Sequence, residues 1–221
     1  MREGILIVNK PSGMTSHDVV FKVRRKFQMR RVGHAGTLDP LATGVLVILL
    51  GKSTKLFEQF VGFDKGYRAT LILGKVTDSA DTQGKVIKEM AFDGITQEQV
   101  EGAFKGFRGE IDQVPPMVSA IKFKGKKLYE LARQGIEVER KPRRVQVTSL
   151  EIERFNNPEV QFYLECSKGT YVRQLAADVG NVLGCGACIS QIERTKVGMF
   201  NIEESVNLED INEGHIRNWQ C

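Results

Sequence analysis

The 221-residue sequence lacks several features that would indicate other classes of protein. No apolar run approaches the ~20 residues that a helix needs to cross a bilayer. The longest run, from Val45 to Leu50, has only the length of a strand. The first residues lead into a short strand-like run, without the long apolar stretch of a signal peptide. We therefore expect a cytoplasmic protein with no membrane partner.

Metal ligands are also scarce. The chain has four cysteines and three histidines, and only Cys185 and Cys188 have the spacing of a metal-binding pair. A structural zinc site normally needs a second such pair or a paired histidine motif, and neither is there. The small residues around the two cysteines indicate a tight turn before a strand, so we expect no metal.

Positive charge exceeds negative charge, with a net charge of +5 at pH 7 and a pI near 9.0. The basic residues gather in four clusters, at 24–26, 30–31, 122–127 and 140–144. A single cluster of this kind is more often a solvated face than a binding site. Four clusters in one chain favour a polyanionic partner such as a nucleic acid.

Strand and helix patterns are mixed without a regular βαβ rhythm. The apolar runs at 5–8 and 45–50 predict buried strands, and the capping box of Thr15 and Asp18 predicts the start of a helix. Further strands are predicted at 67–73, 85–90, 119–123, 144–155, 160–166 and 187–194, and further helices at 54–61, from 96, at 127–134, at 170–183 and near 208. The sequence therefore predicts an α+β fold, with a mostly antiparallel mixed sheet and flanking helices in a single domain over 1–221.

The segment GHAGTLDPLATG, from Gly33 to Gly44, carries the chemistry. Its three glycines allow tight turns and the close approach of a ligand. Pro40 moves Asp39 away from helical geometry, and the apolar strand after Gly44 anchors the segment. We expect a carboxylate on a rigid turn at the edge of a sheet. Most Asp-Pro pairs only cap a turn, and the segment alone favours that simpler interpretation.

Five ordered motifs along nearly the whole chain resemble the TruB family, the bacterial tRNA pseudouridine-55 synthases. The first two are NKPSGMTS at 9–16 and GHAGTLDPLATG at 33–44, the second of which is similar to the family's nucleophile motif. The third joins Tyr67 to TDSAD at 77–81 and Gly84. The segment 113–135 is similar to the family's RNA-clasping insertion, which we place at about 113–144, and CSKGTYVR at 166–173 is similar to its arginine motif.

The resemblance implies a catalytic fold that isomerises uridine to pseudouridine at U55 in the T loop of tRNA. It implies that Asp39 is the nucleophile, that Tyr67 stacks on the flipped uracil and that Arg173 pairs with Asp39. It further implies that His34 splays the RNA loop and that Tyr171 and Ile192 contact the substrate. We expect a monomer without a cofactor, bound to the T stem-loop, and without the PUA module that many relatives carry after the catalytic domain.

The residue types suit these roles, although each has a simpler interpretation. An arginine beside a carboxylate lowers its pKa and orients it, but Arg173 at the edge of an apolar stripe is equally typical of a snorkelling surface residue. A base that is detached and retained needs an aromatic platform, but Tyr67 is otherwise a half-buried strand residue. A lone loop histidine such as His34 is more often simply exposed.

The basic residues are expected to contact phosphates, independently of sequence and with steep salt dependence. They are Lys10, Arg31, Lys122, Lys124, Lys126, Lys127, Arg133, Arg140, Lys141, Arg143 and Arg144. Two alternatives stay open: a pseudouridine synthase with another RNA target, including a guide-RNA-directed one, and an RNA chaperone that folds tRNA without modifying it. The sequence also leaves open whether Asp39 attacks C1′, attacks the uracil ring or promotes elimination to a glycal.

Overall fold

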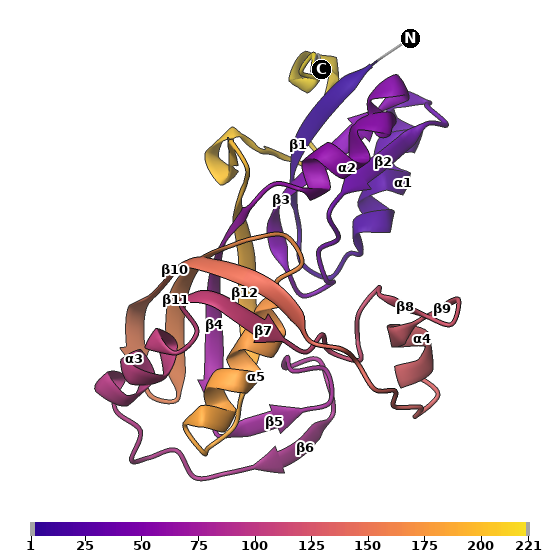
Figure 1. The fold of residues 1–221 in the computed structure, drawn as a ribbon. Coiled ribbons are helices and arrows are strands. Elements are labelled where there is room, and N and C mark those ends of the chain that lie inside the picture. The colour runs from indigo at the N-terminus through magenta and orange to yellow at the C-terminus, as the bar shows by residue number, and fades with distance from the viewer. Residues whose placement is uncertain (1–2, 220–221) are drawn as a thin grey trace. The chain divides into compact units, whose positions relative to one another are not determined.

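The computed structural model of the chain describes residues 3–219 (Figure 1). These residues fold as two compact units. Unit 1 combines the segments Met1–Arg68 and Gln191–Cys221, and unit 2 is Ala69–Ser190. Strands β4 (Lys65–Leu73) and β12 (Ala187–Val197) each begin in one unit and end in the other.

Unit 1 is built around the antiparallel pair of strands β1 and β3. Its elements are β1 (Gly4–Lys10), α1 (Ser16–Phe27), β2 (Val32–Ala35), β3 (Thr43–Leu50), a 3-10 helix (Gly51–Leu56), α2 (Phe57–Val61), β13 (Phe200–Asn201), a 3-10 helix (Ile202–Glu204), β14 (Val206–Asn207) and a 3-10 helix (Glu213–His215). The hydrogen-bonded strand order is β14-β1-β3-β12, with β2 added to β3 and β13 to β12. Strands β14 and β12 are parallel to their neighbours β1 and β3.

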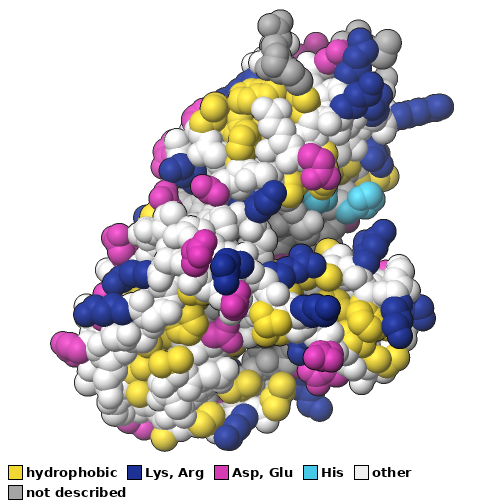
Figure 2. All heavy atoms as spheres, viewed as in Figure 1, with side chains coloured by type: hydrophobic (Ala, Val, Ile, Leu, Met, Phe, Trp, Pro, Cys, Tyr) yellow, Lys and Arg dark blue, Asp and Glu magenta, His cyan; other side chains and the backbone are white. Residues whose placement is uncertain are grey.

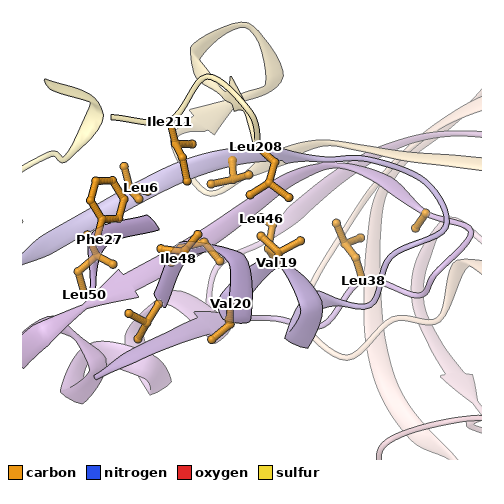
Figure 3. Packing of buried hydrophobic residues seen from close by; sticks show 14 residues of the cluster. Leu6, Val19, Val20, Phe27, Leu38, Leu46, Ile48, Leu50, Leu208 and Ile211 are labelled. Atoms are coloured by element: carbon orange, nitrogen blue, oxygen red, sulfur yellow. The ribbon is translucent and has the colours of Figure 1, made fainter. Parts of the chain in front are cut away.

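Both faces of β1 and β3 are buried, which explains why their sequences are continuously apolar. The register pairs Leu6 with Ile48 and Ile7 with Val47, so successive residues point to opposite faces. One face packs under α1, where Figure 3 shows Leu208 and Ile211 of the C-terminal segment covering the same cluster. The other face packs on aromatic side chains of unit 1, namely Phe60, Phe63, Phe200 and Trp219.

Helix α1 begins at the predicted capping box. The Thr15 hydroxyl accepts a hydrogen bond from the Asp18 amide at 3.1 Å, and the Asp18 carboxylate accepts one from the Thr15 amide at 2.8 Å. Such a cap satisfies amides that the first helical turn leaves free. The buried stripe of α1, Val19, Val20, Val23 and Phe27, holds the helix on the sheet and so fixes the position of Ser16 in its first turn.

Unit 2 carries the long antiparallel hairpin of the fold. Its elements are the second half of β4, β5 (Lys75–Thr77), β6 (Val86–Glu89), α3 (Gln97–Lys105), β7 (Gly109–Gln113), β8 (Lys122–Phe123), β9 (Lys126–Lys127), α4 (Leu128–Ala132), β10 (Arg143–Asn156), β11 (Glu159–Cys166), α5 (Val172–Val182) and the first half of β12. The strand order is β4-β11-β10-β7, and β5-β6 and β8-β9 form separate two-stranded sheets. Helix α3 packs against β10 and α5, and the ring of its Phe104 makes an edge contact with the ring of Phe162 on β11.

The predicted α+β class is confirmed, because the sheet is mixed and mostly antiparallel and helices flank it. Some element predictions were wrong. The strand expected at 119–123 is reduced to Lys122–Phe123, the helix expected near 208 is a turn, and the short strand β2 was not predicted. Among residues 3–219, no helix is both long and apolar enough to span a membrane.

Candidate active site

The Asp39 segment joins β2 to β3 in unit 1. Strand β2 pairs antiparallel with β3, from Val32↔Leu50 to Ala35↔Val47. The segment therefore begins at the end of one strand and ends at the start of its hydrogen-bonded neighbour. Gly36 and Gly44 bracket the segment with φ of +92° and +99°, values that favour glycine. Leu38 and Ala42 are buried in the cluster under α1. The segment is therefore anchored in the core on both sides of Asp39.

Six successive carbonyl oxygens of this segment, from Gly36 to Leu41, each accept a hydrogen bond. The donors are the Arg194 guanidinium for Gly36 and Thr37 (3.1 and 3.4 Å), the Ser16 hydroxyl for Leu38 (3.1 Å), the Ala42 amide for Asp39 (3.1 Å), the Gly13 amide for Pro40 (2.8 Å) and the Ser12 hydroxyl for Leu41 (3.3 Å). The backbone around Asp39 is thus held at every residue, which is the preorganisation that a catalytic carboxylate needs.

Lys10 also holds the Asp39 segment, through hydrogen bonds of its side chain. Its side chain is fully buried, and its ammonium donates to the carbonyl oxygens of Pro11 (2.8 Å), Met14 (2.7 Å) and Pro40 (3.4 Å). Burial lowers the pKa of Lys10 to about 8, against the opposing effect of the nearby Asp39 carboxylate. Its assignment as a phosphate contact was therefore wrong, because the ammonium is turned into the protein and occupied by backbone oxygens.

His34 lies on β2, close before the Asp39 segment. Burial lowers its pKa, with a further contribution from the positive charge of Arg194. The imidazole is therefore neutral at physiological pH. Its Nδ1 atom is buried and has no hydrogen-bond partner within residues 3–219. A neutral ring of this kind suits stacking on a base better than pairing with a phosphate.

The other predicted residues of unit 1 are on β4 and β12. Tyr67 lies in the first half of β4 and is 8% exposed. Ile192 lies on β12 and packs against the cluster under α1. Unit 1 therefore carries the expected nucleophile, base platform, stacking histidine and apolar contact.

Arg173 is in the first turn of α5 in unit 2 and is 4% exposed. Its Nε lies 3.6 Å from a carboxylate oxygen of Asp81. Its two terminal nitrogens donate to the carbonyl oxygens of Ser79 (2.5 Å) and Val118 (2.9 Å). The snorkelling alternative for Arg173 is therefore wrong, since a guanidinium held from three sides is fixed inside the protein.

Tyr171 precedes α5 as its N-cap residue. The buried side-chain amide of Gln113 holds it in both directions, since it accepts from the Tyr171 amide at 2.8 Å and donates to the Tyr171 carbonyl oxygen at 3.1 Å. This pairing ties the end of β7 to the start of the helix that carries Arg173. Sequence reasoning assigned no role to Gln113, although it begins one of the quoted motifs.

The basic insertion of unit 2 comprises the β8–β9 hairpin, α4 and the segment that leads to β10. Figure 2 shows Lys and Arg side chains over this region. Its side chains at 122, 124, 126, 133 and 141 are exposed, as are those at 143 and 144 at the start of β10. Lys127 and Arg133 lie over the ring of Tyr129, each about 5.4 Å from its centroid. Arg140 is instead occupied by Glu137 and by the carbonyl oxygen of Pro115.

Sequence reasoning missed the residues that hold the site rather than react in it. Ser16, Gln113 and Arg194 all bind backbone, and no local pattern predicts which carbonyl oxygens a side chain will meet after folding. Asp81 stands in a quoted motif but was given no role. Among residues 3–219, no cluster of His, Cys, Asp and Glu could hold a metal, and Cys185 and Cys188 are buried around a glycine turn.

Comparison with known proteins assigns both parts of the chain. Residues 24–172 match the TruB family pseudouridylate synthase N-terminal domain, and residues 173–219 match the tRNA pseudouridylate synthase B C-terminal domain. The tRNA pseudouridine synthase B of Clostridium tetani is 51% identical over 97% of this chain and 74% of its own length. That of Endomicrobium trichonymphae is 47% identical over 94% of this chain and 90% of its own.

Solved structures show the same fold. A crystal structure of a Cbf5-Nop10-Gar1 complex superposes with a TM-score of 0.74 at 30% identity, over 95% of this chain and 53% of that one. A structure of an H/ACA RNP bound to a substrate RNA containing 2'-deoxyuridine gives 0.70 at 26% identity, over 94% of this chain and 51% of that one. This chain thus spans about half the length of these two. By sequence and fold, the chain belongs to the TruB family of pseudouridine synthases, which are enzymes of the isomerase class.

Proposed function

We propose that this chain converts uridine to pseudouridine in tRNA, at U55 of the T loop, with Asp39 as the nucleophile. The observation that carries the proposal is the Asp39 segment, in which six successive carbonyl oxygens are bound and the carboxylate stays half-buried. A segment that only turned the chain would not need this degree of support. The names of the relatives, tRNA pseudouridine synthase B, agree with the proposed substrate class.

The chemistry needs one carboxylate and no co-substrate. The N1–C1′ bond breaks and a C5–C1′ bond forms, while C5 loses a proton and N1 gains one. Uracil leaves as a delocalised anion, so no acid has to protonate a poor leaving group. Positive charge develops at C1′, where a carboxylate can stabilise or trap it, as in glycoside chemistry. Attack at C1′, attack at the ring and elimination to a glycal all begin from the same ionised Asp39.

The neighbouring residues of unit 1 would handle the base. Flipping a base out of its stack costs a few kcal/mol and leaves a gap. The neutral ring of His34 would fill that gap, since a charged imidazolium would be more costly to bury there. Tyr67 would stack on the flipped uracil, and Ile192 would provide an apolar wall that excludes water.

We propose, as the family resemblance implies, that Arg173 pairs with Asp39 and that Tyr171 contacts the substrate. Asp39 belongs to unit 1 and Arg173 to unit 2. The proposed pairing of the two residues rests on the family resemblance. The way Arg173 is held within its own unit supports this pairing. Asp81 balances the charge of the guanidinium, and two carbonyl oxygens fix the orientation of its plane. A guanidinium fixed in this way loses little entropy when it binds a carboxylate.

The basic insertion would bind the T stem-loop. Its exposed lysines and arginines, with Tyr129 between two of them, would follow the phosphate backbone and leave specificity to the shape of the RNA loop. We further propose a cytoplasmic monomer whose catalytic domain is a single functional whole over 1–221 and needs no cofactor. Light scattering on the purified chain, alone and with one equivalent of tRNA, measures the oligomeric state.

The test is tritium release from tRNA transcript labelled at C5 of uridine. Wild type should release tritium, Asp39→Asn should release none, and both should bind tRNA equally, because asparagine is nearly isosteric. Asp93→Asn, at an exposed carboxylate, is the matched control and should behave as wild type. Changing the T-loop uridine should abolish release if U55 is the target.

Three outcomes would overturn parts of the proposal. Release by Asp39→Asn at the wild-type rate would remove the nucleophile assignment. Tight tRNA binding without release from wild type would favour the chaperone alternative, and release from the transcript without the T-loop uridine would favour another target site.

A further inference from the structure

We infer that Arg194 is a positioning residue that braces both ends of the Asp39 segment. The inference rests on the proposed function of Asp39. Arg194 lies on β12 in unit 1 and, at 1% exposure, is the largest fully buried side chain among residues 3–219. Its guanidinium donates from Nη2 to Gly36 (3.1 Å), from Nη1 to Thr37 (3.4 Å) and from Nε to Val45 (2.8 Å). The first two acceptors precede Asp39 and the third follows it.

The backbone of Arg194 holds the segment as closely as the side chain does. In the parallel register of β12 and β3, Arg194 stands opposite Gly44. A Cβ at Gly44 would lie 2.3 Å from the carbonyl oxygen of Arg194, so only glycine permits this approach. The end of the segment is therefore pressed against the backbone of Arg194 while its beginning is bound by the guanidinium.

Burying a charged guanidinium at this position costs free energy. All three acceptors are neutral carbonyl oxygens, and the charge of Arg194 lowers the pKa values of Lys10 and His34. An apolar side chain of similar volume would fill the space without burying a charge. What it could not do is satisfy three carbonyl oxygens from one rigid plane, and that ability is specific to arginine.

Loss of the brace should therefore affect chemistry more than RNA binding. Misplacement of a reacting group by about 1 Å can cost about 100-fold in rate. A lysine at 194 keeps the charge but has one nitrogen, which cannot reach carbonyl oxygens on both sides of Asp39 from a single point. We expect Arg194→Lys and Arg194→Met to lower the single-turnover rate by about 10- to 100-fold and to leave the dissociation constant for tRNA unchanged.

The experiment measures single-turnover tritium release, tRNA binding and amide hydrogen exchange on the same purified variants of the 221-residue chain. Two controls separate positioning from stability. Arg154→Lys makes the same chemical change at an exposed position. Val197→Ala removes buried volume on the same strand, in a different hydrophobic cluster from the one that holds Leu38 and Ala42. Both should keep the wild-type rate below their unfolding temperatures, although Val197→Ala should unfold at a lower temperature.

Hydrogen exchange tests the brace independently of activity. In the Arg194 variants, peptides covering 36–44 should exchange faster, while the core of β1 should stay protected. Unchanged exchange there, or an equal loss of rate in Val197→Ala, would overturn the inference. If wild type releases no tritium, the proposed function fails, and the exchange of 36–44 still decides whether Arg194 holds the segment.

Discussion

Ser16 offers the sharpest test of how the Asp39 segment is held. Its buried hydroxyl accepts a hydrogen bond from the Leu38 amide at 2.8 Å and donates one to the Leu38 carbonyl oxygen at 3.1 Å. Ser16→Ala removes both bonds and leaves two buried backbone groups without these partners. Each unpaired buried group costs about 1–3 kcal/mol, so we expect a loss of about 3 kcal/mol in the free energy of unfolding.

For a chain of this size, that loss corresponds to a fall of about 6–12 °C in the midpoint of thermal unfolding. Circular dichroism at neutral pH measures it. The matched control is Ser12→Ala, which removes an exposed hydroxyl bound at 3.3 Å to the neighbouring part of the same segment. That variant should change the free energy of unfolding by no more than about 0.5 kcal/mol. Equal midpoints for the two variants would refute the argument that Ser16 pairs buried backbone groups.

Two further predictions follow from the same segment. Gly44→Ala should lose about 3 kcal/mol or more in the free energy of unfolding, because its positive φ and the clash with Arg194 add together. Denaturant titration measures this loss. Gly13→Ala, with positive φ but no atom within 4 Å of the added Cβ, should lose less in the same titration. Burial lowers the pKa of Lys10 from 10.5 to about 8, so between these pH values the unfolded chain holds a proton that the folded chain has released. The stability of wild type relative to Lys10→Met should therefore rise with pH across this window, and parallel stability curves for the two proteins would contradict the shift.

The helices and strands that were predicted correctly are those whose local sequence pattern agrees with their burial in the fold. The capping box at Thr15 and the apolar stripe behind it agree with α1, and the apolar runs of β1 and β3 agree with two covered faces. Strand β2 was missed because Val32 to Ala35 has little strand propensity of its own and is extended by its pairing with β3. The strand expected at 119–123 is short because only Lys122 and Phe123 pair with β9, whereas Ser119 and Ile121 accept backbone hydrogen bonds from Tyr129 and Leu128 of α4.

The sequence by itself determined the family and the fold class and indicated the proposed reacting groups, because motif spacing and side-chain chemistry are written in the order of the residues. Only the tertiary structure decided which side chains hold those groups. Lys10 and Arg194 are basic, as residues that contact RNA are, yet both side chains point inward and bind backbone oxygens of the Asp39 segment. The physical reason is that a buried carbonyl oxygen must be paired, and its donor is chosen by proximity in the fold, over separations of 30 residues for Lys10 and Pro40 and 158 for Arg194 and Gly36.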